Sequence, residues 1–201
     1  MQAEIQRRFE GNLSRVQHLI DVHARVAPAD GATDDTNADL LRAAVVFMHA
    51  TLEDLLRSVL EWRLPAAPPG HLRDVPLVGK PARSTLTLED LAGHRGSTVD
   101  ELITRSVVAH LDRSNFNNPG EIEKALLSVG LDRGLLAPHK YMLGPMMNRR
   151  HWIVHRTDRP TAARGEPFDP APLDRRDIHS WLQPLTAFGR AVIAALQPLG
   201  A

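Results

Sequence analysis

The sequence predicts an all-α protein built as a helical bundle. Several long segments repeat apolar residues at steps of three and four with charged residues between them, which is the period of an amphipathic helix. No segment shows a convincing strand-like alternation, whereas Thr or Asn stands at several positions where it can cap a helix. These observations favour helices packed around a shared core.

The first two expected helices are long. One covers residues 3–26, and Pro28 with the polar residues after it ends that helix. The second reaches Leu64, and its middle, Ala43 to His49, is apolar on nearly every side, so we expect it at the centre of the bundle. Three residues are able to cap its start: Thr36, Asn37 and Asp39.

A proline-rich stretch follows the second helix. Residues 64–84 contain five prolines and two glycines, a composition that cannot continue as an α-helix. We interpret this stretch as an excursion between the second and third helices rather than as a domain linker. The whole chain, residues 1–201, is therefore expected to form a single domain.

Shorter helices are expected in the second half of the chain. Thr87 and Thr98 each precede an acidic residue by three positions, the spacing of a capping box, and Asn118 stands directly before a proline suited to the first turn of a helix. Gly144 with Pro145 is expected to interrupt the helical run, so that a new helix begins near Pro145. The last helix should cover residues 174–196 with a proline inside it.

Composition excludes several classes of function. Lys and Arg together number 24, as do Asp and Glu, so any charge-driven binding must come from local clustering. Cysteine is absent, which removes disulfides, thiol nucleophiles and Cys-ligated zinc and suits a reducing cytoplasm. The N-terminus lacks the apolar region of a signal peptide, and no apolar run is long enough to span a membrane. We expect a cytoplasmic protein with no membrane partner.

One local cluster of cations stands out near the end of the sixth expected helix. It contains a single acid, Asp158, and its basic members are Arg149, Arg150, His151, His155, Arg156, Arg159 and Arg164. Arg150 and His155 form an R-x4-H pair, although the chain is rich enough in arginine that chance supplies about one such pair at each spacing. Arg105 with His110 is one of the chance pairs.

The segment 149–158, RRHWIVHRTD, resembles the signature of the HEPN superfamily, in particular the branch associated with RiboL-PSP domains. Residues 40–60, with the acidic pair Glu53 and Asp54, and residues 114–132 are also similar to that branch. The resemblance implies a HEPN-like helical bundle that dimerises so that two R-x4-6-H motifs line one cleft. In many members of the family that cleft is the active site of a metal-independent endoribonuclease. The resemblance also implies a toxin or antiviral-defence context.

Transferred to this chain, the resemblance implies that His155 is the catalytic acid and base and that Arg150 stabilises the phosphate. His151, Arg149, Arg156, Glu53 and Asp54 would support them. RNA cleavage through its own 2′-hydroxyl needs a proton acceptor, a proton donor and a cation at the phosphate, which histidine and arginine supply without a cofactor. The expected partners are RNA, a second copy of the chain, and an antitoxin or defence-system protein, with no role predicted for DNA.

Other interpretations of these residues stay open. Some HEPN proteins are catalytically inactive modules that bind RNA or protein, and Arg/His clusters at helix ends often only complement the helix dipole. His151 and His155 have the spacing of a helical metal pair, but Trp152 stands where metalloproteases place glutamate. Glu53 and Asp54 either brace Arg150 or face solvent. Two further groups are expected to serve mainly in packing: Met142, Met146 and Met147, and Trp152 and Trp181.

Overall fold

A computed structural model describes residues 1–26, 35–81, 84–158 and 172–196. Within these ranges the chain is all-helical and contains no strand, which confirms the predicted fold class. The α-helices are α1 (Gln2–Val26), α2 (Asp35–Arg63), α3 (Leu88–Ala92), α4 (Val99–Leu111), α5 (Pro119–Ser128), α6 (Lys140–Arg156) and α7 (Arg175–Ala195). Three short 3₁₀ turns complete the list: η1 (Leu64–Ala66), η2 (Pro69–Leu72) and η3 (Arg133–Leu135).

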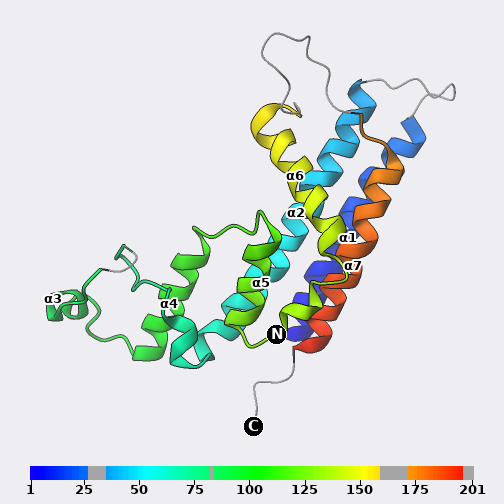
Figure 1. The fold of residues 1–201 in the computed structure, drawn as a ribbon. Coiled ribbons are helices and arrows are strands. Elements are labelled where there is room, and N and C mark those ends of the chain that lie inside the picture. The colour runs from blue at the N-terminus through cyan, green and yellow to red at the C-terminus, as the bar shows by residue number, and fades with distance from the viewer. Residues whose placement is uncertain (27–34, 82–83, 159–171, 197–201) are drawn as a thin grey trace.

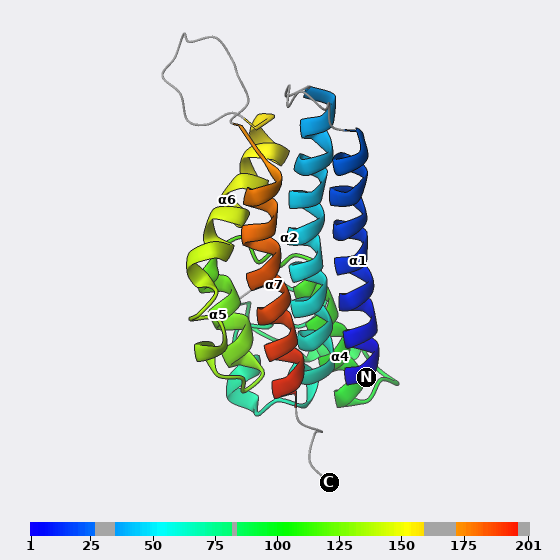
Figure 2. The ribbon, with the colours of Figure 1, turned by 90° about the vertical axis from the view of Figure 1, so that its right-hand side faces the viewer.

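Four helices, α1, α2, α6 and α7, run alternately up and down and form the body of the bundle (Figures 1 and 2). Helix α2 contacts α1, α4, α5, α6 and α7 and therefore occupies the centre, as its apolar middle predicted. Ala44, Val45 and Met48 are fully buried there. One contiguous core joins buried side chains from Ile5 on α1 to Leu196 after α7.

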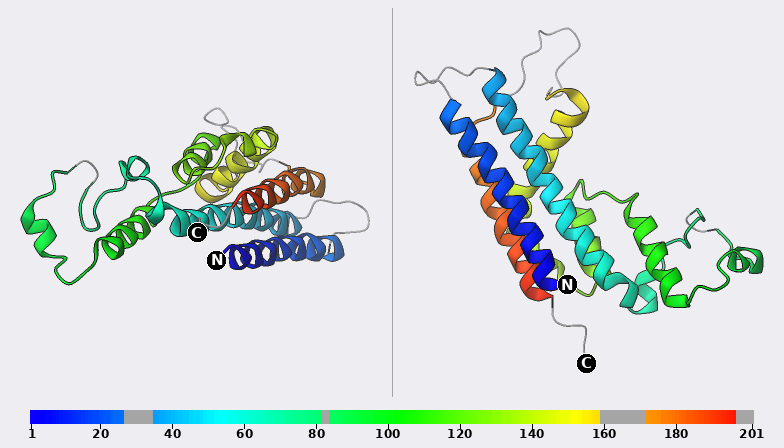
Figure 3. Two further views of the ribbon diagram at one scale, coloured as in Figure 1. Left: turned by 90° about the horizontal axis from the view of Figure 1, so that it is seen from below. Right: turned by 180° about the vertical axis from the view of Figure 1, so that it is seen from behind.

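Helices α3 and α4 project from this body together with the proline-rich excursion, as the view from below shows (Figure 3). The predicted end of α2 at this excursion is confirmed. The helix ends at Arg63, and the described residues between it and α3 form two 3₁₀ turns, η1 and η2, and no α-helix. The capping boxes at Thr87 and Thr98 start α3 and α4, and the side chain of Asn118 accepts a hydrogen bond at the start of α5. These local signals therefore predicted the starts of α3, α4 and α5 correctly.

The expected break at Gly144 and Pro145 is wrong, because α6 runs continuously from Lys140 to Arg156. A proline inside a helix removes one backbone hydrogen bond, here the bond to the carbonyl of Tyr141, which lies on an exposed face where water can hydrate it. Leu143 before the proline and Met146 after it are both fully buried and hold the two halves of the helix against the same core.

The predicted caps of α2 also require correction. The helix already begins at Asp35, so Thr36, Asn37 and Asp39 lie inside it. The Asn37 side chain instead donates a 3.4 Å hydrogen bond to the carbonyl of Val26, the last residue of α1. This bond ties the start of α2 to the end of the preceding helix.

Candidate functional site

The final three turns of α6 carry the basic cluster, and the helix as a whole contains no acidic residue. Arg149 is buried, Arg150 is partly buried, and His151, His155 and Arg156 are exposed. The adjacent arginines thus turn inward while both histidines face solvent. Arg159 and Arg164, the remaining members of the predicted cluster, lie outside the described residues.

Arg149 belongs to a buried ion triad. Its Nε lies 2.8 Å from Oδ1 of Asp158, and its Nη2 donates to Oδ2 of the same carboxylate over 2.9 Å. Arg42 on α2 also donates from Nε to Oδ2 of Asp158, at 2.8 Å. Asp158 is only 2% exposed and its carboxylate contacts two guanidinium groups, while Arg42 also pairs with Asp39 at 2.9 Å. The predicted supporting role of Arg149 at the phosphate needs correction, because its guanidinium faces this carboxylate instead of solvent.

A left-handed turn at the end of α6 makes this ion triad possible. Thr157 and Asp158 have φ angles of 51° and 62°, which fold the chain back over the last turn of the helix. The backbone N–H of Asp158 donates to the carbonyl of Trp152 over 2.9 Å. A β-branched residue is rarely found at such an angle, so Thr157 carries backbone strain that the ion triad must offset.

Arg150 faces a second buried group, His49 on α2. Both ring nitrogens of His49 lack a hydrogen-bond partner among the described residues, and only 1% of its surface is exposed. Burial lowers the pKa of His49; the carboxylate of Glu53 raises it and the charge of Arg150 lowers it further. His49 Nδ1 lies 3.7 Å from Oε2 of Glu53. Because the lowered pKa disfavours the charged form of His49, this is a contact of a neutral imidazole.

The two adjacent acids of α2 serve different neighbours. Asp54 pairs with Arg8 and accepts a 3.2 Å hydrogen bond from Asn12, both on α1. The idea that Asp54 braces Arg150 is therefore wrong, because consecutive residues on a helix point to different sides. Glu53 lies on the side of Arg150 and accepts a 3.4 Å hydrogen bond from the backbone N–H of Phe116, but no ion pair joins it to Arg150 in the described part of the chain.

The two histidines of α6 share one face, as their spacing predicted. Their ring centroids are 4.9 Å apart and the rings are tilted by 46°. In the described ranges no group of three or more His, Asp or Glu side chains is arranged to hold a metal ion. The pair therefore lacks a third ligand from these residues. Both imidazoles are exposed on a helix that contains no acidic residue.

The packing interpretation fits most of the remaining candidates. Met146 and Met147 are buried, and Trp181 on α7 is 9% exposed in the core. Trp152 and Met142 are partly buried. Sequence reasoning missed His49 and Arg42. Their only signals were a histidine four residues before Glu53 within an apolar run and an arginine within the first turns of the central helix.

None of the helices in the described ranges is both long enough and apolar enough to cross a membrane. Comparisons of this chain with protein-family models, with curated proteins and with solved structures found no match.

Proposed function

We propose that the protein is a metal-independent endoribonuclease of HEPN type that cleaves RNA through the 2′-hydroxyl group of its substrate. The observation that carries the proposal is the pair of exposed histidines, His151 and His155, held 4.9 Å apart on a helix without acidic residues. Arg150 precedes them on the same helix and turns toward His49, and no acid of the described chain forms an ion pair with its guanidinium. RNA binding is supported by the concentration of histidine and arginine side chains on this part of α6.

In the proposed reaction the 2′-oxygen of the substrate attacks the adjacent phosphorus, and the bond from phosphorus to the 5′-oxygen breaks. His155 takes the proton from the 2′-hydroxyl, and a protonated histidine, supplied by His151 or by the second copy, gives a proton to the leaving 5′-oxygen. Arg150 binds the phosphate oxygens, where negative charge increases in the transition state. The products are a 2′,3′-cyclic phosphate and a free 5′-hydroxyl.

A homodimer is part of the proposal because Arg150 and His155 diverge around α6. Arg150 turns toward His49 on α2, whereas His155 faces solvent. Two copies related by a twofold axis bring the arginine of one near the histidine of the other. Two large apolar residues of α6 are also exposed, Tyr141 at 86% near its start and Val154 at 47% near its end.

A toxin or phage-defence context in the cytoplasm, with an antitoxin or defence-system partner, completes the proposal. A second candidate is a catalytically inactive HEPN module that binds RNA or protein. The burial of Arg149 against Asp158 favours it, since that arginine is then withdrawn from the phosphate. The two candidates differ in turnover.

The decisive experiment incubates purified protein with a mixed RNA pool and compares it with His155→Ala. The proposal expects cleavage by the wild-type protein and none by the variant. Arg105→Ala is the matched control: Arg105 forms the chance R-x4-H pair and only donates to Ser97 on the projecting part. Cleavage that survives in His155→Ala would reject the assigned site, and absence of cleavage by the wild type would favour the binding module.

A further inference from the structure

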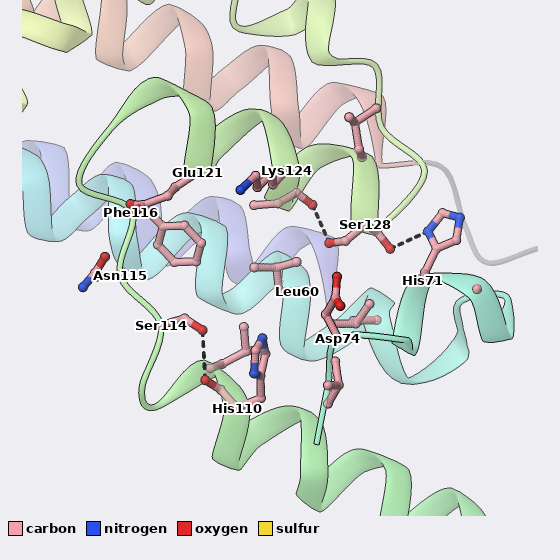
Figure 4. Close-up of a pocket in the computed structure, with 16 residues that line it drawn as sticks. Leu60, His71, Asp74, His110, Ser114, Asn115, Phe116, Glu121, Lys124 and Ser128 are labelled. Atoms are coloured by element: carbon pink, nitrogen blue, oxygen red, sulfur yellow. Dashed lines mark hydrogen bonds between the residues drawn. The ribbon is translucent and has the colours of Figure 1, made fainter. Parts of the chain in front are cut away.

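A cavity of about 600 Å³ lies away from the basic cluster, at the C-terminal end of α2. The end of α2, the turn η2, the end of α4 and helix α5 surround it (Figure 4). Small-ligand sites in proteins usually have volumes of about 300–1,000 Å³. The cavity is therefore large enough for a ligand of the size of a nucleotide.

The floor of the cavity is apolar. Leu60 of α2, Leu64 of η1, Leu111 of α4 and Phe116 of the following loop line it, and each is no more than 4% exposed. Such a floor offers apolar side chains to one face of a ring. A ring placed there would displace water from side chains that the rest of the fold already holds in position.

The walls are fixed by hydrogen bonds within the protein. His71 donates from Nδ1 to the carbonyl of Ser128 over 2.8 Å, which joins η2 to the end of α5. Arg57 donates from Nη2 to the carbonyl of Ser114 over 3.2 Å, and the N–H of Asn117 donates to Glu121 over 2.7 Å. The cavity is thus formed before any ligand binds.

Three polar side chains around the floor remain available. Asp74 and His110 stand on one side, and Lys124 of α5 stands on the opposite side (Figure 4). None of the three side chains forms a hydrogen bond or ion pair with a residue in the described ranges. Burial lowers the pKa of His110 while the nearby carboxylate of Asp74 raises it, so a neutral imidazole that both donates and accepts is favoured near pH 7.

We propose that this cavity binds a nucleobase together with its attached phosphate. The base lies on Leu60 and Leu64, Asp74 accepts a hydrogen bond from an exocyclic amino group of the base, and Lys124 pairs with the phosphate. A free aromatic amino acid fits less well, because its ammonium and carboxylate groups share one carbon, whereas Asp74 and Lys124 stand on opposite sides of the floor.

The nucleotide comes either from an RNA strand or from the free pool, and only the RNA source rests on the proposed nuclease function. Phe116 lines the cavity, and its N–H bonds to Glu53 beside the buried His49 of α2. Leu60 follows Glu53 by seven residues, a distance of about 10 Å along α2.

Calorimetric titrations of the full chain test the proposal with AMP, UMP, adenosine and a short single-stranded oligoadenylate as probes. Lys124→Ala should weaken AMP binding about tenfold and leave adenosine binding unchanged, because only the phosphate is affected. Asp74→Ala should weaken AMP binding and spare UMP, whose base has no exocyclic amino group. Arg25→Ala, an exposed cation at the end of α1, is the control and should behave as wild type.

The source is decided by which probes bind: AMP alone indicates a free nucleotide, and the oligoadenylate alone, with the same dependence on Lys124, indicates RNA. No saturation by any probe at millimolar concentration overturns the proposal, as does binding that neither variant changes. The RNA titration uses His155→Ala protein to avoid cleavage. If that variant still cuts RNA, the nuclease assignment fails while the AMP titrations keep their meaning. Unchanged circular dichroism melting of the variants excludes misfolding.

Discussion

Arg149 and Asp158 form a buried ion pair in which the guanidinium Nε lies 2.8 Å from the carboxylate Oδ1. Arg42 joins the same carboxylate from α2 at 2.8 Å. The ion pairs therefore link the end of α6 to the central helix. They also distinguish two adjacent arginines of the basic cluster: Arg149 contacts Asp158, whereas Arg150 is partly buried near His49.

Replacing Asp158 should destabilise the protein strongly. Asp158→Asn removes the buried carboxylate that Arg149 contacts and leaves Arg42 with Asp39 alone, which costs about 3 kcal/mol of unfolding free energy. Urea denaturation measures the loss. Asp112→Asn, at an exposed position after α4, should change stability by less than about 0.5 kcal/mol. Equal stability of the two variants would show that the ion triad contributes little to the fold.

The buried His49 should make stability depend on pH. Its pKa in the folded protein is lowered, mainly by burial, so the unfolded chain binds a proton more readily. Stability is then complete above the ordinary histidine pKa and falls as the pH drops below it toward the folded pKa. His49→Leu should reduce the change in melting temperature between neutral and mildly acidic pH. His18→Leu, at an exposed position on α1, is the control and should keep the wild-type slope.

Glycine 189 should tolerate no side chain. A Cβ added to Gly189 on α7 would overlap the ring of Phe9, with Cε2 at 2.6 Å, and Phe9 is 1% exposed. Gly189→Ala should therefore cost about 2 kcal/mol through overpacking between α1 and α7. Gly11 lies on the same helix as Phe9, and a Cβ added there would meet nothing within 4 Å. Gly11→Ala should therefore stabilise the protein by about 1 kcal/mol. Thermal denaturation of both variants gives the comparison, and a stable Gly189→Ala would contradict this packing.

Arg150→Lys should reduce turnover more than RNA affinity if Arg150 stabilises charge that develops on the phosphate. Lysine keeps the charge but loses the planar fork that binds two phosphate oxygens at once. Single-turnover cleavage and filter-binding assays separate the two quantities. Arg105→Lys is the control and should affect neither. Equal losses of rate and affinity in Arg150→Lys would assign the residue to binding alone.

Cleavage should depend on the 2′-hydroxyl at the cut site and not on a divalent metal. A substrate with one 2′-deoxy substitution at that nucleotide should resist cleavage there, because the attacking oxygen is missing. Activity should persist in EDTA, and mass spectrometry should find a 2′,3′-cyclic phosphate on the product. Normal cutting of the deoxy substrate, or activity lost on chelation and restored by Mg²⁺ or Mn²⁺, would remove His155 from the role of base and favour metal chemistry.

Local sequence signals predicted the helices well and the candidate site only in part. Capping patterns at Thr98 and Asn118 act within four residues, so their effect can be predicted without the rest of the fold. Pro145 was misjudged for the opposite reason: whether a proline ends a helix depends on the core contacts on both sides of it, here those of Leu143 and Met146.

The sequence by itself determined the all-helical class, the central position of α2 and the shared face of His151 and His155, because these follow from the helical period. Only the tertiary structure decided which arginine is buried, that Asp54 pairs with α1 while Glu53 bonds to the loop before α5, and that Asp74 and Lys124 lie on opposite sides of a cavity. Burial and ion pairing join residues far apart in the chain, and helical periodicity carries no information about which distant side chain supplies the opposite charge.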